Sequence, residues 1–594
     1  MTSGRAGTSP GPAAGQARRR RRISLKVLVA LAVAISAGVM VTLTATAKAA
    51  RKPCDGQPVR AAVAVSPDIA PAVTTVGKLF NRQHHLVSGH CEQVSVVPEP
   101  PGVVAAVLDG QGAAPRGLPA VSAWIPDSSL WLDVARSFPV GARVVQPSGI
   151  HVARSPLVIV MPGDAAARVA SFGASVGWKF LLPASDGGPP ASQHLRVDLP
   201  DPAQSAAGLA TLVQVSRLLG NGASARTAFT RFVFASEATE QVQGPQALTP
   251  FITLAKPPLN GNPVTITSEQ EVLQYDRAHP GEPLAARYPL TSSAALGSPE
   301  LDYPYVLTAA QPQLAQAVRQ FGSLLTQPYA AGLVRYDGFR SASNVAASAP
   351  ARFGLSGQLM RIATAPAASE AQSALQAWQR LGVSARDLAL IDISGAMAAP
   401  AGPGVTLEQE VGQAAGLGLA LFPDNTRMGL WAYADRLSGG LPYRQVVSVG
   451  PLTGELGLIS RRQQLTEANQ TLKPVSGTPA ALNKAILAGY KHMTDTYQAK
   501  YANAVLVLTS GADEARDDIS LSSLLSQLHQ LYNPDRPVQI VIIMFGAHGD
   551  FRAMQEIAAA TAGTAYEISQ PSQIGKVFFE AIAQRICATS CATP

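Results

Sequence analysis

An acid and a hydroxyl, Asp392 and Ser394, stand directly after a short apolar run, and their oxygen atoms could hold a ligand. The run covers residues 388–391, and Gly395 follows the two polar residues. An apolar run of this length that is closed by glycine is typical of a buried parallel strand entering a loop. Ligands of open α/β sheets bind at the carboxyl ends of the strands. We therefore expect Asp392 and Ser394 to lie at a binding site.

Four segments in this part of the chain resemble, in the same order, the motifs of the von Willebrand factor type A (VWFA) domain. The run ending in Asp392 and Ser394 resembles the D-x-S-x-S motif. Residues 476–478, Ser-Gly-Thr, precede a predicted helix over residues 480–490 and resemble the threonine loop. Residues 504–511 resemble the strand ending in T-D-G, and residues 539–546 resemble a later core strand. The resemblance covers roughly residues 385–585. It implies a Rossmann-like α/β domain there.

In that family the motif oxygens hold a divalent cation, so the resemblance implies Asp392, Ser394 and Thr478 as ligands of Mg²⁺ or Mn²⁺. The sequence departs from the motifs twice: Ala396 replaces the second serine, and Ser510 replaces the aspartate of T-D-G. These changes remove one oxygen and one charge. The loss matters because Mg²⁺ requires oxygen ligands in near-octahedral geometry. Two interpretations stay open. One is a degenerate cation site, and the other is a site without an ion, in which Asp392 and Ser394 end a strand and cap a helix.

Positive charge is concentrated at the amino terminus. The formal net charge is +8, yet residues 1–52 alone contain ten basic residues and no acid, so the remainder is slightly acidic and gives no reason to expect a nucleic-acid partner. Residues 18–22 are all arginine, and residues 27–47 carry no charge. At about 1.5 Å per residue, a helix of that length crosses a hydrocarbon core of about 30 Å.

This pattern predicts a cytoplasmic basic tail over residues 1–22 and a transmembrane signal-anchor over residues 23–49. The bulk of the chain would then lie outside the cytoplasm, on a single-pass protein of the cell membrane. The alternative is a cleaved signal peptide and a secreted protein, because small residues at positions 45, 47 and 49 form cleavage-like sites.

All four cysteines follow the apolar segment, which places them in an oxidising compartment and favours disulfides. We predict one bond between Cys54 and Cys91, near the start of the first domain, and one between Cys587 and Cys591 at the tail. Free thiols are the alternative for the tail pair. A zinc site is disfavoured, since neither pair has C-x-x-C spacing.

Residues 54–345 alternate short apolar runs with helix-like stretches. Strands are expected over residues 60–65, 93–97, 120–125, 156–161 and 195–199, and helices over residues 70–82, 130–136 and 205–219. Alternation of this kind predicts an α/β fold with a largely parallel sheet.

Short phrases at residues 122–131, 155–162 and 301–307 resemble bacterial extracellular solute-binding proteins, which implies two lobes with a small ligand between them. In that family, hydroxyls and backbone N–H groups at helix amino termini hold the ligand. The matching residues here are Ser66, Ser128 and Ser205. The partial positive charge and free donors of a first helical turn would suit a small anionic solute. The alternative is that each serine only caps its own helix.

Residues 346–384 are predicted to be a linker and a docking helix. Residues 341–357 are rich in Ser, Ala, Gly and Pro, as linkers are. A helix expected over residues 369–381 carries an apolar stripe, which we predict docks onto the next domain. Beyond it, helices are expected over residues 407–421, 483–496, 551–561 and 573–586, and strands over residues 427–433 and 446–449, the latter at a sheet edge.

The predicted fold class is therefore α/β. One transmembrane helix precedes a two-lobed, periplasmic-binding-protein-like domain over residues 54–345, and a Rossmann-like VWFA domain over residues 385–590 follows. The chain has no G-x-S-x-G, no H-E-x-x-H and no P-loop, so we do not expect an enzyme. We predict a non-catalytic extracytoplasmic recognition protein whose VWFA domain contacts a protein or surface partner. The alternatives are solute capture for an uptake system and a cell-envelope hydrolase.

Overall fold

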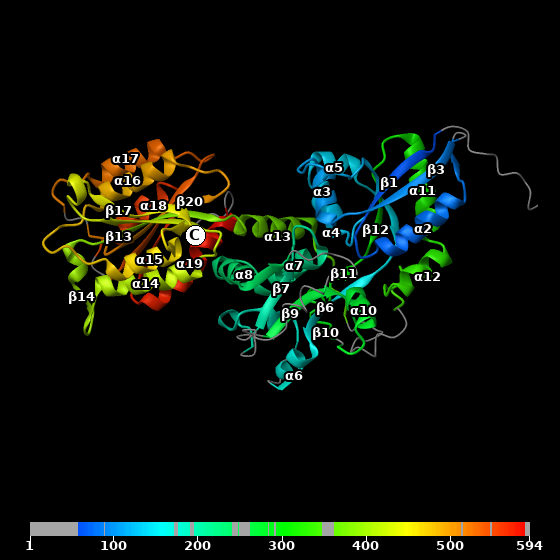
Figure 1. Cartoon of the computed structure of the whole chain (residues 1–594), viewed down its shortest axis with the longest axis horizontal. Coiled ribbons are helices and arrows are strands. Elements are labelled where there is room, and N and C mark those ends of the chain that lie inside the picture. The colour runs from blue at the N-terminus through cyan, green and yellow to red at the C-terminus, as the bar shows by residue number, and fades with distance from the viewer. Residues whose placement is uncertain are drawn as a thin grey trace, which may run out of the picture.

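The computed structural model describes residues 57–87, 90–171, 176–189, 195–239, 248, 262–282, 284–289, 291, 293–346, 361–512, 515–546 and 549–587. The molecule is elongated, with two bodies joined through helix α13 (Ala368–Leu381) (Figure 1). The predicted tail and transmembrane segment lie outside the described residues. Among the helices that are described, none is both long and apolar enough to span a membrane.

The first body, residues 57–346, has two lobes, and a mixed sheet in the order β2-β3-β1-β4-β12-β5 forms the core of the first lobe. Its strands are β1 (Val59–Val65), β2 (Leu86–Val87), β3 (His90–Pro98), β4 (Val121–Ile125), β5 (Gln146–His151) and β12 (Pro304–Leu307), and its helices are α2 (Ala70–Arg82), α3 (Pro101–Asp109), α4 (Leu130–Arg136), α5 (Pro139–Val144), α11 (Pro312–Leu325) and α12 (Pro328–Tyr336). Strand β1 is parallel to both β3 and β4 and is buried from Ala61 onward, as its unbroken apolar sequence predicts. Helices α2 and α4 have the bounds that the sequence predicted.

A second mixed sheet, in the order β10-β6-β9-β7-β8 with β11 also paired to β6, forms the second lobe. Its strands are β6 (Ser155–Pro162), β7 (Leu195–Pro200), β8 (Ser236–Thr239), β9 (Asn262–Ser268), β10 (Leu284–Arg287) and β11 (Glu300–Leu301), and its helices are α6 (Gly163–Ser171), η1 (Trp178–Leu181), η2 (Ala184–Asp186), α7 (Ala206–Leu219), α8 (Ala223–Ala235) and α10 (Glu269–Ala278). The chain crosses between the lobes at residues 152–154 and at residues 302–303. These two crossings form the hinge.

The second body, residues 385–587, is a three-layer α/β unit around a sheet in the order β17-β16-β13-β20-β21-β22. Its strands are β13 (Ala385–Asp392), β16 (Arg427–Tyr433), β17 (Tyr443–Pro451), β20 (Ala502–Thr509), β21 (Val538–Phe545) and β22 (Thr564–Ile568), with two hairpins, β14 (Pro400–Gly402) with β15 (Val405–Thr406) and β18 (Glu455–Leu456) with β19 (Ile459–Ser460). Only β17, the predicted edge strand, runs antiparallel within this sheet.

Helices cover both faces of that sheet. They are η5 (Gly395–Ala398), α14 (Leu407–Leu421), η6 (Ser438–Gly440), α15 (Arg461–Thr471), α16 (Leu482–Asp495), α17 (Leu521–Leu531), α18 (Phe551–Ala559), η7 (Pro571–Gln573), α19 (Ile574–Ala583) and η8 (Gln584–Cys587). Helices α16, α17 and α18 pack with Leu388 and Leu390 of β13, whereas α14, α15 and α19 pack with Ile391 on the opposite face. Successive side chains of a strand alternate between faces, so each apolar layer takes every second residue of β13.

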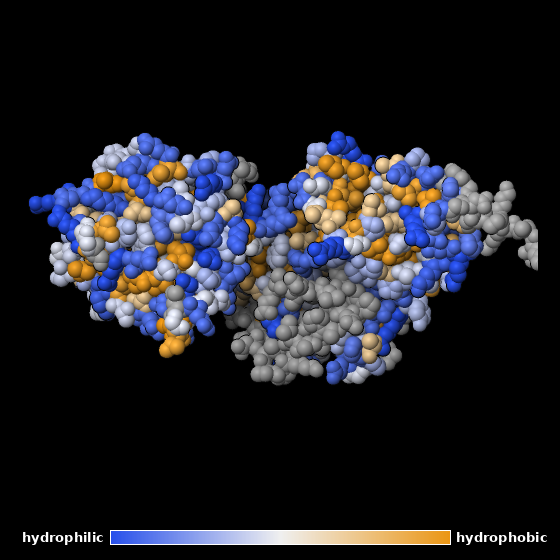
Figure 2. All heavy atoms as spheres, turned by 45° about the horizontal axis from the view of Figure 1, so that its top comes forward, coloured by the Kyte–Doolittle hydropathy of each residue, from blue (hydrophilic) through white to orange (hydrophobic). Residues whose placement is uncertain are grey.

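The junction between the bodies is apolar. Helix α13 packs on α4 and α7 of the first body, and its last turn meets η8, where Arg380 donates to the carbonyl of Ile586 at 2.5 Å. The expectation that this helix docks onto the next domain is therefore met only at its end. Helix α19 packs on α8, with Phe234 and Phe578 edge to face at 6.1 Å between ring centroids. On the face seen in Figure 2, apolar residues elsewhere form separate small patches on both bodies.

Candidate functional site

The carboxyl end of β13 brings polar groups together as the sequence predicted. Asp392 and Ser394 are 1% and 0% exposed, and Asp392 Oδ1 accepts the backbone N–H of Ser394 at 2.8 Å. In the sheet, Asp392 lies opposite Tyr433 of β16, and Ile391 lies opposite Leu508 of β20. The residues that directly follow β20 therefore lie beside Asp392.

Three buried oxygens at this strand end have no hydrogen-bond partner among the described residues: Asp392 Oδ2, Ser394 Oγ and Ser510 Oγ. Burial raises the pKa of Asp392 to about 6, while the backbone N–H groups of Ser394 and Ser510 oppose that rise. Ser394 stands at the start of η5, yet its side chain makes no capping bond. One interpretation was that Ser394 caps a helix, and its side chain forms no such hydrogen bond in this structure.

The loop with Thr478 lies against the same strand end. Its carbonyl accepts the N–H of Gly395 at 2.8 Å, and the N–H of Val475 donates to the carbonyl of Ile393 at 2.8 Å. Ser510 emerges as a further candidate ligand, which sequence reasoning treated only as the loss of an aspartate. Hard cations prefer such oxygen donors, so the residues present fit a divalent ion with Asp392 as the single charged ligand.

Ser66, Ser128 and Ser205 are all buried in the first body, and each has a local partner. Ser66 Oγ donates to Asp68 Oδ1 at 2.6 Å. Ser128 Oγ accepts the N–H of Leu130 at 3.2 Å, and Ser205 Oγ accepts the N–H of Ala207 at 3.2 Å. The Ser205 contact is a helix cap, which was the alternative interpretation of these serines, whereas the N-cap position of α4 belongs to Ser129 and not to Ser128. The anion-binding role of the three serines stays a prediction.

Two carboxyl groups lie among these serines. Asp68 accepts a hydrogen bond from the hydroxyl of Tyr303, and Asp127 Oδ2 accepts the N–H of Ala206, at the first turn of α7, at 2.9 Å. Burial raises the pKa of both acids; for Asp127 it reaches about 8, with the charge of Asp68 as the second cause. Donors that an anion would use at this helix start are therefore paired within the chain.

The lobes touch at this point. Asp127 follows β4 of the first lobe and Ala206 begins α7 of the second, so their hydrogen bond crosses between lobes. Close by, the N–H of Gly102 donates to the carbonyl of Gln204 at 3.4 Å. A Cβ atom on Gly102 would lie 1.9 Å from the carbonyl oxygen of Ala203, so only glycine permits this approach.

A cavity of about 250 Å³ lies between the lobes beside the hinge. Its lining comes from the first lobe, the second lobe, the hinge and the start of the connector, and its polar members include Asp133, Arg154, Gln214, Glu300 and Asp302. Gln214 Oε1 and Glu300 Oε1 are buried and have no partner among the described residues. Burial raises the pKa of Asp133. Two residues of the lining therefore carry buried acceptor atoms that lack a donor among the described residues.

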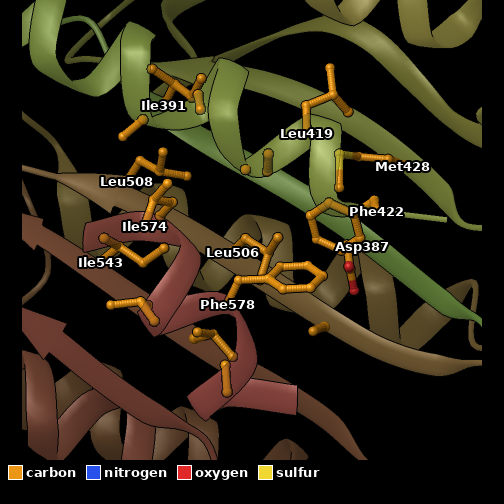
Figure 3. Close-up of a pocket in the computed structure, with 18 of the residues that line it drawn as sticks. Asp387, Ile391, Leu419, Phe422, Met428, Leu506, Leu508, Ile543, Ile574 and Phe578 are labelled. Atoms are coloured by element: carbon orange, nitrogen blue, oxygen red, sulfur yellow. The ribbon is translucent and has the colours of Figure 1, made fainter. Parts of the chain in front are cut away.

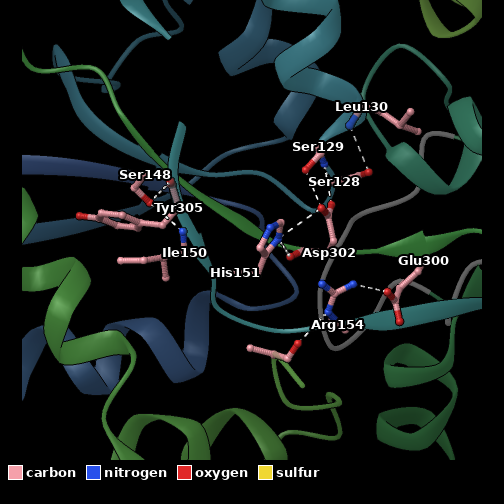
Figure 4. Close-up of polar contacts among 11 residues, drawn as sticks. Ser128, Ser129, Leu130, Ser148, Ile150, His151, Arg154, Glu300, Asp302 and Tyr305 are labelled. Atoms are coloured by element: carbon pink, nitrogen blue, oxygen red, sulfur yellow. Dashed lines mark hydrogen bonds and ion pairs between the residues drawn. The ribbon is translucent and has the colours of Figure 1, made fainter. Parts of the chain in front are cut away.

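The hinge beside the cavity is held by two ionic contacts (Figure 4). Asp302 accepts from the backbone N–H and the hydroxyl of Ser129, at 2.7 and 2.5 Å, and its Oδ2 lies 3.3 Å from His151 Nδ1. Arg154 pairs with Glu300. Because the Ser129 hydroxyl donates to the carboxylate and not to the imidazole, this cluster lacks the nucleophile–base contact of a serine hydrolase.

The predicted disulfides and an acidic segment, residues 513–518, both fall partly outside the described residues. Cys54 and Cys591 are not described, so both disulfide pairings stay predictions, although Cys91 is buried in β3. Within the acidic segment of residues 513–518, Asp518 accepts the N–H groups of Asn483 and Lys484 at 3.0 and 2.9 Å and so caps α16, and Asp517 pairs with Arg436. These two acids serve local structure.

Comparison with known proteins finds a family that is similar to the first body. A model of the family described as bacterial extracellular solute-binding protein matches residues 61–340. Residues 61–340 of the first body are therefore similar to bacterial extracellular solute-binding proteins. No curated protein matches the chain.

Solved structures resemble parts of the chain at low identity. The sulfate-binding protein SubI from Mycobacterium tuberculosis H37Rv is 16% identical, with 52% of this chain and 94% of that one covered and a TM-score of 0.34. The apo ferric ion-binding protein A of Pasteurella haemolytica is 11% identical, with 54% and 96% covered and a TM-score of 0.38. A von Willebrand factor type A structure from Catenulispora acidiphila is 19% identical, with a TM-score of 0.26; 34% of this chain and 43% of that one are covered, less than half of its length. At these TM-scores the likenesses say nothing of function.

Proposed function

We propose that the first body captures a small solute outside the cytoplasm, in the cavity of about 250 Å³ beside the hinge. The observation that carries the proposal is the convergence on one cavity of groups from both lobes and from the hinge. In a two-lobed binding protein such a position lets the ligand stabilise one relative arrangement of the lobes. The match of residues 61–340 to solute-binding proteins supports the same function.

The lining favours a solute that donates hydrogen bonds. Arg154 donates to Glu300, and the hydroxyl of Ser129 donates to Asp302, so the strongest donors of the cavity already have partners. Gln214 Oε1 and Glu300 Oε1 have no hydrogen-bond donor among the described residues, and Asp133 adds a carboxyl group to the lining. A polyol, a sugar or an amine satisfies these acceptors, whereas an anion meets mainly other acids. This solute class differs from the small anion that the three serines predicted, and that anion stays the alternative.

Thermal unfolding of the full chain with glucose, putrescine or sulfate tests the proposal. A solute at about 100 times its dissociation constant adds about 2.7 kcal/mol to the folded state. We expect glucose or putrescine to raise the unfolding temperature, and Asp133→Asn to reduce the effect of putrescine, with the exposed Asp535→Asn as the matched control. A response to sulfate alone would instead support the anion site at Ser66, Ser128 and Ser205.

Membrane attachment belongs to the same proposal. We infer that residues 23–49 anchor the chain and that the captured solute is passed to a partner permease, because an anchored binding domain stays near its transporter. The apolar length of that segment and its arginine block support the anchor.

We infer a second, separate function for the second body, namely contact with a protein or surface partner. The buried oxygens of Asp392, Ser394 and Ser510 that have no hydrogen-bond partner among the described residues favour it, together with the resemblance of the motifs to VWFA domains. Asp392, Ser394, Ser510 and the Thr478 loop would hold a divalent cation, and the ion would supply positive charge for an acidic group of the partner.

A further inference from the structure

A second cavity, of about 130 Å³, lies inside the second body between the sheet and helices α14 and α19. Apolar side chains make up most of its lining, among them Ile391, Leu419, Leu506, Leu508, Ile543 and Ile574 (Figure 3). An engineered apolar cavity of about 150 Å³ binds benzene, so this volume suits a single aromatic ring or a short alkyl chain.

One carboxyl group interrupts this apolar lining. Asp387 is 2% exposed and shares the face of β13 that Ala389 and Ile391 also present to the cavity. In Figure 3 it stands at one end of the lining beside Phe422, with Ile391 towards the other end. Asp387 Oδ1 has no hydrogen-bond partner among the described residues. A buried carboxyl group without a partner is costly, and a donor from a ligand would relieve that cost.

The charged surroundings of Asp387 leave room for such a donor. Arg585 of η8 also lines the cavity and lowers the pKa of Asp387, but Arg585 donates to the carbonyl of Val383 at 3.2 Å and forms no ion pair with Asp387 in the described structure. Arg386, the preceding residue, donates instead to Asn503 and Thr496 across the other face of the sheet. Burial outweighs both arginines and raises the pKa of Asp387 to about 7.

The cavity also adjoins the junction of the two bodies. Phe422, Phe578, Ile582 and Arg585 line it and line as well a hollow of about 380 Å³ between the second body, α8 and the end of α13. The shared residues form a thin wall between the two spaces. A small molecule could reach the inner cavity from the junction by displacing the two phenylalanine rings.

We propose that this cavity binds a small apolar amine, with its ring or alkyl chain against the β13–α19 layer and its ammonium group donating to Asp387. The site is independent of the solute cavity in the first body and of the strand end at Asp392. It needs no ion and no partner protein.

Ligand-observed NMR on the full chain with benzylamine, benzyl alcohol and benzoate tests this. The three probes share one ring and differ in the charge and donors of the head group. We expect benzylamine to bind at least about tenfold more tightly than benzoate, since a charge-assisted hydrogen bond is worth roughly one such factor. Asp387→Asn should remove that preference, and Ala389→Leu, which fills the cavity from the sheet side, should weaken benzylamine and benzyl alcohol alike.

The exposed Asp495→Asn on the opposite face of the sheet is the matched control and should leave all three affinities unchanged. Far-ultraviolet circular dichroism and unfolding temperature show whether each variant is folded. Equal binding of benzylamine and benzoate, or benzylamine binding that survives Ala389→Leu in a folded protein, would overturn the proposal. No binding of any probe at millimolar concentration would overturn it as well.

Discussion

Arg217 of α7 and Glu370 of α13 form a two-pronged ion pair, with Nε–Oε1 and Nη2–Oε2 distances of 2.8 and 2.9 Å. The same guanidinium donates to the carbonyl of Thr364 at 2.8 Å. Residues 361–364 in turn run beside Ser298, which exchanges backbone hydrogen bonds with Arg361 and Ala363 at 3.1 and 2.8 Å. One arginine of the second lobe thus fixes the chain that leads to the second body.

Arg217→Lys should loosen this connector, because an ammonium group cannot form both contacts with the carboxylate and also reach the carbonyl. The pair is partly exposed, so we expect a loss of no more than about 1 kcal/mol in unfolding free energy. Hydrogen exchange should rise over residues 361–367. Arg552→Lys, in an exposed pair with Glu556 at 3.1 Å, is the control and should change neither quantity. Unchanged exchange in Arg217→Lys would show that apolar packing of α13 alone holds the connector.

Local patterns predicted the helices and strands well, and the tertiary contacts poorly. The bounds of α2, α4 and α14 follow from apolar periodicity and from Pro or capping residues at their starts, all of which are local. Arg217 and Glu370 are 153 positions apart, and His151 and Asp302 are 151 apart. No local pattern specifies such partners, because they meet only when the lobes and the connector have folded together.

Asp127 should make stability depend on pH. Its pKa is about 8 in the folded state, whereas an ordinary aspartate has a pKa of 3.8, so the folded chain keeps a proton that the unfolded chain releases between these values. Stability from this group therefore falls as pH rises through that window. Asp127→Asn has no proton to lose and retains an oxygen for the N–H of Ala206. We expect the variant to gain on the wild type by a few kcal/mol, to order of magnitude, between about pH 5 and pH 8.5.

Urea unfolding of both proteins at several pH values measures that gain, and Asp535→Asn, exposed in a loop of the second body, provides the baseline. A difference between Asp127→Asn and the wild type that does not change with pH would mean that Asp127 is already ionised in the fold.

The stability contributed by the hinge pair, His151 and Asp302, should be lost at high pH through His151 and at low pH through Asp302. The Asp302 carboxylate raises the pKa of His151, so that contribution is complete below about 6.5 and is lost as pH rises through the folded value. The pKa of Asp302 is lowered, because hydrogen bonds from His151 and Ser129 outweigh its burial; its contribution is lost as pH falls below about 3.8. His151→Gln should therefore cost most near pH 5 and least near pH 8.

The size of that cost should stay under about 1 kcal/mol, since the His151 side chain is one-third exposed. Urea unfolding at the two pH values measures it, and the exposed His529→Gln is the control. A cost that is larger at pH 8 than at pH 5 would contradict a charged His151 in the fold.

The candidate sites differ in how far the sequence could reveal them. Asp392, Ser394 and Thr478 lie in recognisable motifs, and the parallel register brings their segments together as expected. Asp387 gave a weaker signal: it is an acid on the face of β13 that also carries Ala389 and Ile391, and only the packing of α19 shows that this face is enclosed. Asp68 and Asp127 looked like ordinary loop acids until the lobes enclosed them.

A divalent cation should stabilise the second body through Asp392. At saturation near 100 times the dissociation constant, Mg²⁺, Mn²⁺ or Ca²⁺ adds about 2.7 kcal/mol, which moves the unfolding transition of the full chain by a few degrees relative to EDTA. Because the bound carboxylate must be ionised and its pKa is about 6, the shift should grow between about pH 5 and pH 7.5.

Asp392→Asn should be more stable than the wild type in EDTA, since burial no longer opposes a charge, and should not respond to cations. Ser510→Ala should respond to cations more weakly than the wild type. Asp424 is exposed before the start of β16, so Asp424→Asn is the control and should respond to cations as the wild type does. If no cation moves the wild-type transition at pH 7.5, the strand end holds no ion, and partner contact by this body must rest on metal-free surfaces.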